Sequence, residues 1–256
     1  MKHGDFSELA KEYARYRAGY SEFALDAILG LIGKTNNEIN FVDVGAGTGI
    51  WTRMVAKRGC KTIAIEPNDE MRQFGQTGND SLEINWLKGS AENTGLAENS
   101  CDLVTMASSF HWPNFDVAMK EFNRILRPNG LFVALWNTRL IELNPLLVEI
   151  EEHLKKLVPD MKRVSSGRSE FCEHLTERLA ESHYIKNVLY LEGQHVEYQT
   201  PEHYIGLWRS VNDVRVQAGA EKFEQFIQYI TDRISHLEFV EAAYLTRIWI
   251  AQKKSC

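Results

Sequence analysis

The residues best suited to chemistry lie in a glycine-rich segment at positions 41–49. Its sequence, FVDVGAGTG, is typical of a buried parallel strand that turns sharply into a helix. Gly45, Gly47 and Gly49 carry no side chain that would hold a ligand away from the backbone. The free N–H groups and the dipole of the next helix favour a carboxylate or a phosphate. The segment therefore predicts a nucleotide-binding turn, of a type found in several classes of α/β protein.

A glutamate follows the next predicted strand. That strand covers residues 62–65, and Glu66 ends it nineteen positions after Gly47. In a doubly wound sheet the carboxyl end of the second strand lies beside the glycine-rich turn, so an acidic residue there can accept hydrogen bonds from both hydroxyls of a ribose. An isolated glutamate at a strand end is more often simply solvated. The spacing favours the ligand-binding interpretation.

The N-terminal segment combines a helical pattern with many tyrosines and arginines. Within positions 5–20 these are Tyr13, Arg15, Tyr16, Arg17 and Tyr20. One interpretation is an amphipathic helix with solvated arginines, and the other is a lid over a ligand. The residue pattern leaves both interpretations open.

The elements that must position these residues alternate between strand and helix. Strands are predicted at 39–44, 62–65, 83–87, 103–106 and 131–136. One helix is predicted before them at 21–32, and others follow the first, second and fourth strands, whereas a small polar turn follows the third. Such alternation over about 140 residues specifies an open parallel sheet covered on both faces. After residue 137, helices are predicted at 145–158, 170–182, around 204–208 and at 223–234, with two more strands at 188–198 and 244–251.

Composition disfavours several classes of protein. The 256 residues include 29 Lys+Arg and 35 Asp+Glu, a net charge of −6, and no basic run of the kind that nucleic acids bind. No apolar run reaches the length of a membrane span and no apolar signal region is present, so a cytoplasmic protein without a membrane partner is expected. The four cysteines and eight histidines form no metal-ligand motif, which predicts no metal site.

Five motifs resemble those of class I S-adenosylmethionine-dependent methyltransferases, specifically the small-molecule branch that includes trans-aconitate methyltransferase and its biosynthetic relatives. They occur in the family's order and spacing over residues 40–136, whereas residues 140–243 match in general layout alone. The motifs are VDVGAGTG at 42–49, IEP at 65–67, GSAE at 89–92, FHW at 110–112 and LRPNG at 126–130. The resemblance implies a Rossmann-like fold and S-adenosyl-L-methionine as the cofactor.

The resemblance also implies which residues contact the cofactor. Gly45, Ala46 and Gly47 would approach its methionine part and ribose, while Asp43 would support its ammonium group and Glu66 would hold the ribose hydroxyls. The other implied contacts are Pro67 beside Glu66, Met71 near the adenine, Ala91 and Glu92 at the adenine edge, Ser108 through its backbone carbonyl, and Tyr13, Arg17 and Tyr20 in a lid that reaches the carboxylate.

Three features of the sequence bear on related activities. Asn129-Gly130 replaces the family's commoner double glycine, which is a mild departure. Ile50 stands where a dinucleotide-binding G-x-G-x-x-G would have its third glycine, which disfavours a nicotinamide dehydrogenase. No Asp/Asn-Pro-Pro-Tyr motif follows the fourth strand, which disfavours methylation of an exocyclic amide or a base amine.

The chemistry of a sulfonium methyl group indicates what the acceptor site must do. The methyl group is already an activated electrophile, so the protein must hold a nucleophile in line with it and exclude water. If the acceptor must lose a proton, His111 is the candidate base, although a partly buried aromatic residue that shapes the pocket is the favoured interpretation. A carboxylate acceptor would need no base and would be bound by an arginine, with Arg17, Arg139 and Arg209 available. Aromatic residues that could wall a flat acceptor are Tyr16, Trp112, Trp136 and Trp208.

The residues and the resemblance together predict an α/β fold with a Rossmann-like, doubly wound, seven-stranded and mostly parallel sheet, an N-terminal lid helix and a helical cap. The expected divisions are 1–38 for the lid helices, 39–137 for the cofactor-binding core, 138–243 for the cap helices and sixth strand, and 244–256 for the final strand of the core sheet. Methyl transfer to O or N of a small-molecule metabolite or natural-product intermediate is expected, rather than transfer to C, in a monomer or homodimer. The alternatives are a non-catalytic cofactor-binding protein of the same fold and an RNA-modifying methyltransferase, the latter disfavoured by the acidic charge balance.

Overall fold

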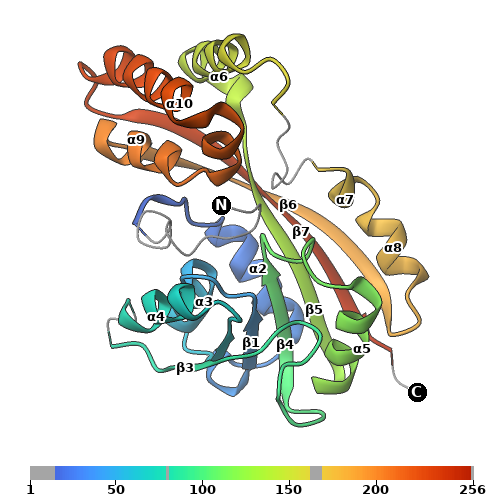
Figure 1. Cartoon of the computed structure of the whole chain (residues 1–256). Coiled ribbons are helices and arrows are strands. Elements are labelled where there is room, and N and C mark those ends of the chain that lie inside the picture. Colours follow the sequence, from blue (N-terminus) through green and yellow to red (C-terminus); the bar gives the residue numbers. More distant parts are fainter. Residues whose placement is uncertain (1–14, 79–80, 162–168, 255–256) are drawn as a thin grey trace.

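One seven-stranded sheet forms the centre of the protein (Figure 1). The computed structural model describes residues 15–78, 81–161 and 169–254, and its strand order is β3-β2-β1-β4-β5-β7-β6. The strands are β1 Asn40–Val44, β2 Lys61–Ile65, β3 Ile84–Leu87, β4 Cys101–Ala107, β5 Leu126–Arg139, β6 Ile185–Gln199 and β7 Val240–Lys253. The first five pair in parallel, and β7 runs antiparallel between β5 and β6. The predicted seven-stranded, mostly parallel sheet is confirmed.

The strand order reverses at β1, the strand that ends in the glycine-rich turn. β2 and β3 extend the sheet on one side of β1, whereas β4 and β5 extend it on the other. In open α/β sheets a crevice forms at such a reversal, beyond the carboxyl ends of the strands, and ligands bind there. The topology therefore places the glycine-rich turn at the expected binding position.

The helices begin and end close to the positions that the sequence predicts. They are α2 Glu22–Ile32, α3 Ile50–Lys57, α4 Asp69–Thr77, α5 Phe115–Ile125, α6 Pro145–Leu157, α7 Glu170–Glu173, α8 Leu175–Glu181, α9 Pro201–Arg209 and α10 Asn212–Ile234, with 3₁₀ turns η2 Asn36–Glu38 and η3 Ile141–Leu143. Local signals set these ends. The Ser21 side chain caps α2 by accepting a hydrogen bond from Ala24 N, and Gly33 ends the helix in the left-handed conformation.

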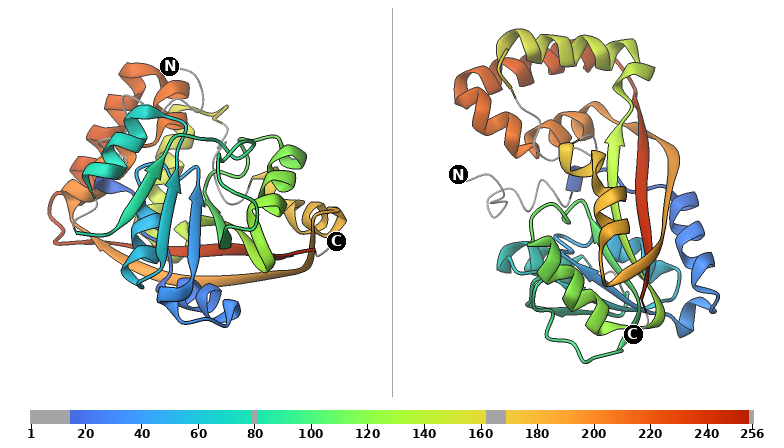
Figure 2. Two further views of the ribbon diagram at one scale, coloured as in Figure 1. Left: turned by 90° about the horizontal axis from the view of Figure 1, so that it is seen from below. Right: turned by 90° about the vertical axis from the view of Figure 1, so that its right-hand side faces the viewer.

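Helices cover both faces of the sheet. Apolar residues of α2 and α3 pack on one face, and those of α5, α7 and α8 pack on the other. The right-hand view of Figure 2 shows α2 and α8 on opposite sides of the strands. Along β5, Val133 and Leu135 belong to the core under α2 and α3, and Ala134 and Trp136 belong to the core under α5, α7 and α8. A strand buried on both faces reads as one continuous apolar run, which is the pattern at 131–136.

The last three strands are longer than predicted. β5 continues to Arg139, and β6 and β7 contain 15 and 14 residues. The ladder between β5 and β7 reaches the pair Arg139 and Tyr244, past the part of β5 that pairs with β4. The apolar pattern marked only the section buried between helices, because the extension contains polar residues such as Asn137 and Thr138.

A third apolar core lies at the extended end of β5, β6 and β7. We call α6, α9 and α10 the cap, because Figures 1 and 2 show them together beyond the parallel strands. Buried residues of the cap core include Leu147, Trp208 and Phe226, with Tyr244 from β7. This core is separate from the two cores on the sheet faces.

Two helices of the region predicted as cap lie elsewhere. α7 and α8 are the two parts of the helix expected at 170–182, and their buried residues Cys172, Leu175 and Leu179 join the core on the sheet face with α5. The difference arises because the pattern of apolar residues shows that a helix has a buried face without showing which surface covers it.

Candidate functional site

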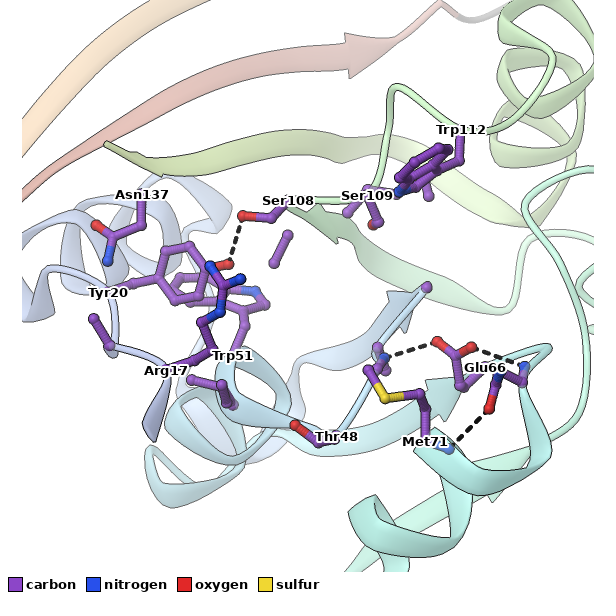
Figure 3. A pocket seen from close by; sticks show the side chains of 18 of the residues that line it. Arg17, Tyr20, Thr48, Trp51, Glu66, Met71, Ser108, Ser109, Trp112 and Asn137 are labelled. Atoms are coloured by element: carbon purple, nitrogen blue, oxygen red, sulfur yellow. Dashed lines mark hydrogen bonds between the residues drawn. The ribbon is translucent and has the colours of Figure 1, made fainter. Parts of the chain in front are cut away.

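A cavity of about 720 Å³ lies at the strand reversal and continues toward the cap. We call the part around Gly45–Gly47, Glu66 and Met71 the turn end, and the part around Arg139, Glu151 and Tyr244 the cap end. Figure 3 shows Glu66 and Met71 on one side and Tyr20 and Ser108 on the other. The predicted site residues in the cavity wall are Arg17, Tyr20, Gly45, Ala46, Gly47, Glu66, Pro67, Met71, Ala91, Glu92, Ser108, Trp112 and Arg139.

The glycine-rich turn is shaped by backbone bonds to the neighbouring strand. Gly45 N and Ala46 N both donate to Ile65 O, at 2.8 and 3.1 Å. Gly45 has a φ of 67°, in the left-handed region, and a Cβ at this position would lie 2.9 Å from Ser109 Oγ. The turn therefore requires glycine at position 45 both for its backbone conformation and for its close approach to Ser109.

Glu66, directly after β2, is hydrogen-bonded to the glycine-rich turn that follows β1. Its Oε2 accepts a hydrogen bond from Gly47 N and its Oε1 accepts one from Asn68 N, both at 2.8 Å. Burial raises the pKa of Glu66, and the two backbone donors partly offset this rise. Each carboxylate oxygen can accept more than one hydrogen bond, so both oxygens can still receive ligand hydroxyls. The position fits the predicted diol-binding role.

The next helix and loop complete the turn end. Asn68 caps α4, because its Oδ1 accepts hydrogen bonds from Glu70 N and Met71 N. Its cap places Met71 in the cavity wall beside Gly47, whose Cβ would lie 3.5 Å from the Met71 methyl carbon. Ser90, Ala91 and Glu92 form the adjacent wall, together with Pro67. This apolar and polar mixture suits a flat heterocycle with a polar edge.

The N-terminal segment lies across the cavity, fastened to the sheet. We call residues 15–20 the N-terminal strap. Gly19 N donates to Glu197 Oε1 at 2.9 Å, and Asn137 Nδ2 donates to Gly19 O at 2.6 Å. Residues 17–20 are not helical, so the predicted helix over 5–20 is wrong for this part. Tyr13 lies outside the described residues.

Two side chains of the strap line the cavity. The Tyr20 hydroxyl and Ser108 Oγ share a hydrogen bond of 3.0 Å, which Figure 3 shows as a dashed line. The Tyr20 ring also meets the Trp51 ring edge-on, with centroids 5.4 Å apart. Arg17 donates from Nη2 to Ser210 O at 3.2 Å. The strap therefore links the turn after β4 to the cap across the ligand space.

Asp43 lies behind the turn instead of in the cavity wall. Its Oδ2 accepts a hydrogen bond from Thr52 Oγ1 at 2.6 Å and its Oδ1 accepts one from Thr105 Oγ1 at 2.8 Å. Thr105 Oγ1 in turn accepts the indole N–H of Trp51. Complete burial raises the pKa of Asp43 to about 7. The structure thus differs from the predicted ammonium contact, because Asp43 is 1% exposed and lies outside the cavity wall.

The raised pKa predicts how stability depends on pH. A carboxyl group with a higher pKa in the folded state binds more protons there than in the unfolded state, so its contribution to the free energy of unfolding falls from about pH 4 to pH 7. Asp43→Asn should remove that dependence. We expect the variant to gain about 2 to 3 kcal/mol over the parent between pH 5 and pH 8. Urea unfolding of both proteins at the two pH values gives their free energies of unfolding. The same difference between variant and parent at both pH values would contradict the prediction.

The cap end of the cavity holds an ion pair. Arg139, the last residue of β5, donates from Nη2 to Glu151 Oε1 of α6 at 3.0 Å. The guanidinium stacks on the Trp208 ring at 4.5 Å from its centroid. Arg139 and Glu151 both line the cavity, with Tyr244 and Val211 near them. Arg139, predicted to bind the acceptor, thus lies in the cavity wall, and its role stays a prediction.

Three of the four aromatic residues predicted to line the acceptor pocket are buried in the protein interior instead. Trp136 and Trp208 are 1% and 0% exposed and lie outside the cavity wall, since both are surrounded by core residues. Tyr16 is also buried, and its ring packs on Gly206 of α9. Trp112 is 48% exposed and is the one of the four that lines the cavity.

His111 does not line the cavity. Its ring lies among Trp112, Trp136 and Phe171, with centroids 4.5, 6.2 and 6.4 Å away. Burial lowers the pKa of His111 to about 4. The predicted base is therefore placed behind Trp112, where it shapes the pocket wall, and its role as a base gains no support from the geometry.

Several residues of the cap end were not predicted from the sequence. They are Asn137, Thr138, Ile141, Glu151, Val211 and Tyr244. Asn137 directly follows the predicted fifth strand, and the ends of neighbouring parallel strands meet at one edge of a sheet. Its place in the cavity wall could therefore have been predicted from the sequence. Glu151 carried none, because a charged residue on an amphipathic helix is usually solvated.

Metal and membrane features were searched within the described residues. No group of three or more His, Cys, Asp or Glu side chains is placed to hold a metal ion in residues 15–78, 81–161 and 169–254. Over the same ranges, none of the helices has the length and apolar character needed to cross a bilayer.

Comparison with known proteins agrees with this geometry. Residues 42–134 match the family described as "Methyltransferase domain". An uncharacterized methyltransferase of Mycobacterium tuberculosis is 33% identical over 134 residues, which are 52% of this chain and 52% of that protein. The ubiquinone/menaquinone biosynthesis C-methyltransferase of Rubrivivax gelatinosus is 32% identical over 97 residues, which are 38% of each. The chain thus spans about half, or less, of the length of these curated relatives.

A solved structure shares the whole fold. A protein from Anaeromyxobacter dehalogenans, provisionally named a type II methyltransferase, has a TM-score of 0.66 at 18% identity, covering 93% of this chain and 98% of that chain. Residues 42–134 thus match a methyltransferase domain, and the fold of the chain is that of this solved structure. The narrower resemblance to trans-aconitate methyltransferase stays a prediction.

Proposed function

We propose that this protein transfers the methyl group of S-adenosylmethionine to an oxygen or nitrogen atom of a small molecule. One observation carries the proposal: a single cavity runs from the glycine-rich turn and Glu66 to the ion pair beneath the cap. Such a cavity can hold a cofactor and an acceptor side by side. The volume of about 720 Å³ is within the range of small-molecule sites.

The residues of the turn end fit the cofactor. Glu66 would bind the ribose hydroxyls through its two oxygens, and the absence of side chains at Gly45 and Gly47 leaves room for the methionine part. Met71 and Ala91 would contact the adenine. When bound, the cofactor supplies an electrophilic methyl group on a positively charged sulfur.

The protein's own contribution would be orientation and exclusion of water. The N-terminal strap covers the cavity through the Tyr20–Ser108 hydrogen bond, while Trp112 and Pro113 form the wall after β4. The cavity wall contains no histidine, lysine or cysteine within the described residues. Where an acceptor must lose a proton, a carboxylate of the wall such as Glu92 would have to accept it.

The proposed function is tested by adding the protein and S-adenosylmethionine to a metabolite extract and searching by mass for products that gain one methyl group. Fragmentation of the product shows whether O, N or C carries it. The Rubrivivax relative is named as a C-methyltransferase, so a C-methylated product would correct the proposed atom. Cofactor binding without any methylated product would favour the non-catalytic alternative, and methylated RNA would favour the RNA-modifying one.

A further inference from the structure

The ion pair between Arg139 and Glu151 is unusual in its position. Both side chains line the cavity, with 15% and 21% of their surfaces exposed. The other ion pairs of the cap, such as Arg233 with Glu149 and Arg209 with Glu224, join exposed side chains outside the cavity wall. The first pair therefore lies where an acceptor would bind.

Arg139 donates to Glu151 from one terminal nitrogen of its guanidinium group. Arg139 uses Nη2 and Glu151 uses Oε1, at 3.0 Å. A planar carboxylate can instead face the guanidinium with two parallel hydrogen bonds, and that arrangement is stronger. A ligand carboxylate could form this two-bond arrangement with Arg139.

Arg139 cannot be left without an anionic partner. Its guanidinium is enclosed by the Trp208 ring, on which it stacks at 4.5 Å, and by the buried side chain of Tyr244, its partner in the β5–β7 ladder. A charge held in such surroundings is costly unless it is paired. Exchanging one carboxylate for another keeps the Arg139 charge paired, and the cost that remains is that of turning the Glu151 carboxylate, 21% exposed, toward solvent.

We propose that the acceptor carries a carboxylate group that replaces Glu151 as the partner of Arg139. This inference rests on the proposed function and adds the chemical class of the acceptor. Glu151 holds the guanidinium in place when no acceptor is present, and it turns away when the acceptor carboxylate binds. The remaining wall at this end is mixed: Ile141, Val211 and the Tyr244 ring offer apolar contacts, and Asn137 and Thr138 offer hydrogen-bonding groups.

The test compares the parent with four variants of the full chain, among them Arg139→Lys, each loaded with S-adenosylhomocysteine. Arg139→Gln removes the guanidinium, Glu151→Gln removes the competing charge while keeping the shape, and Glu149→Gln is the matched control on the same helix, in an exposed ion pair. The probes are pairs of an acid and its amide: benzoate and benzamide, phenylacetate and phenylacetamide, hexanoate and hexanamide. Affinities are measured by calorimetry, and circular dichroism with thermal melting confirms that each variant is folded.

The expected results have opposite signs for the two members of the ion pair. In the parent, at least one carboxylate binds about 10-fold to 100-fold more tightly than its amide. Arg139→Gln reduces this preference to less than about threefold, and Arg139→Lys, which keeps the charge but not the planar fork, restores only part of it. Glu151→Gln strengthens carboxylate binding by at least about threefold, and Glu149→Gln leaves it unchanged. If the ion pair had only a structural role, Arg139→Gln and Glu151→Gln would both weaken carboxylate binding or both leave it unchanged.

Several outcomes would overturn the inference. One is a panel in which no carboxylate binds more tightly than its amide, and another is a Glu151→Gln variant that binds carboxylates more weakly than the parent. Methyl transfer to an acceptor without a carboxylate would also overturn it, while leaving the proposed methyltransferase function in place. Failure of S-adenosylmethionine to bind would count against the proposed function itself.

Discussion

Glu66→Ala is expected to weaken S-adenosylmethionine binding by about 100-fold. The carboxylate is buried beside the glycine-rich turn, where we propose that it accepts hydrogen bonds from both ribose hydroxyls. A hydrogen bond to a charged group contributes about 1.5 to 3 kcal/mol. Loss of two such bonds, at the lower value, therefore weakens binding by about 100-fold. Calorimetry of cofactor binding measures the loss directly.

The variant also removes two internal contacts, because Gly47 N and Asn68 N lose their acceptor. Glu66→Gln separates this effect, since the amide oxygen can keep one backbone donor, and we expect a loss of about tenfold in affinity. Glu70→Ala, on the exposed first turn of α4, is the matched control and should bind the cofactor normally. Full affinity in Glu66→Ala would exclude the diol-binding role.

Gly206→Ala is expected to detach the N-terminal strap from the cap. A Cβ at position 206 would lie 2.5 Å from the ring of Tyr16, which is buried against α9 and cannot move aside without leaving its site. Overpacking of this kind costs about 1 to 3 kcal/mol. The strap carries Arg17 and Tyr20 into the cavity wall, so binding of cofactor and acceptor should weaken together.

Limited proteolysis gives the measurement for this variant. Trypsin should cut after Arg15 or Arg17 about tenfold faster in Gly206→Ala than in the parent, because cleavage follows the population of the detached state. Gly30→Ala is the control, since Gly30 also lies inside a helix but a Cβ there would meet no atom within 4 Å. That change should raise stability by up to about 1 kcal/mol. Equal cleavage rates in both variants would show that the contact of Tyr16 with Gly206 does not hold the strap.

The cofactor half of the site could be predicted from the sequence because its signals are local. The glycines of the turn, Glu66 at the end of β2 and the cap at Asn68 each follow a strand within a few residues, and parallel strands bring their carboxyl ends to one edge. The class of fold followed from the alternation of strands and helices, and the family match confirms the class of enzyme domain.

The cap half could not be predicted in the same way. Whether Trp136, Trp208 and Tyr16 face a ligand or a core depends on which elements cover them, and those elements are far away in the sequence. Tyr16, for example, packs on α9, about 190 residues further along the chain. The pairing of Arg139 with Glu151 likewise depends on how α6 folds back over the end of β5. Residue types alone gave no sign of it.

The long antiparallel ribbon of β5 and β7 has a consequence for how this protein could change its acceptor. It carries Arg139 and Tyr244 outward to a core that shares no residue with the cores around the cofactor turn. Substitutions in α6, α9 or α10 can therefore reshape one half of the cavity while the backbone around Gly45 and Glu66 stays as it is. Evolution, or a designer, could exchange the specificity of such an enzyme as a separate module.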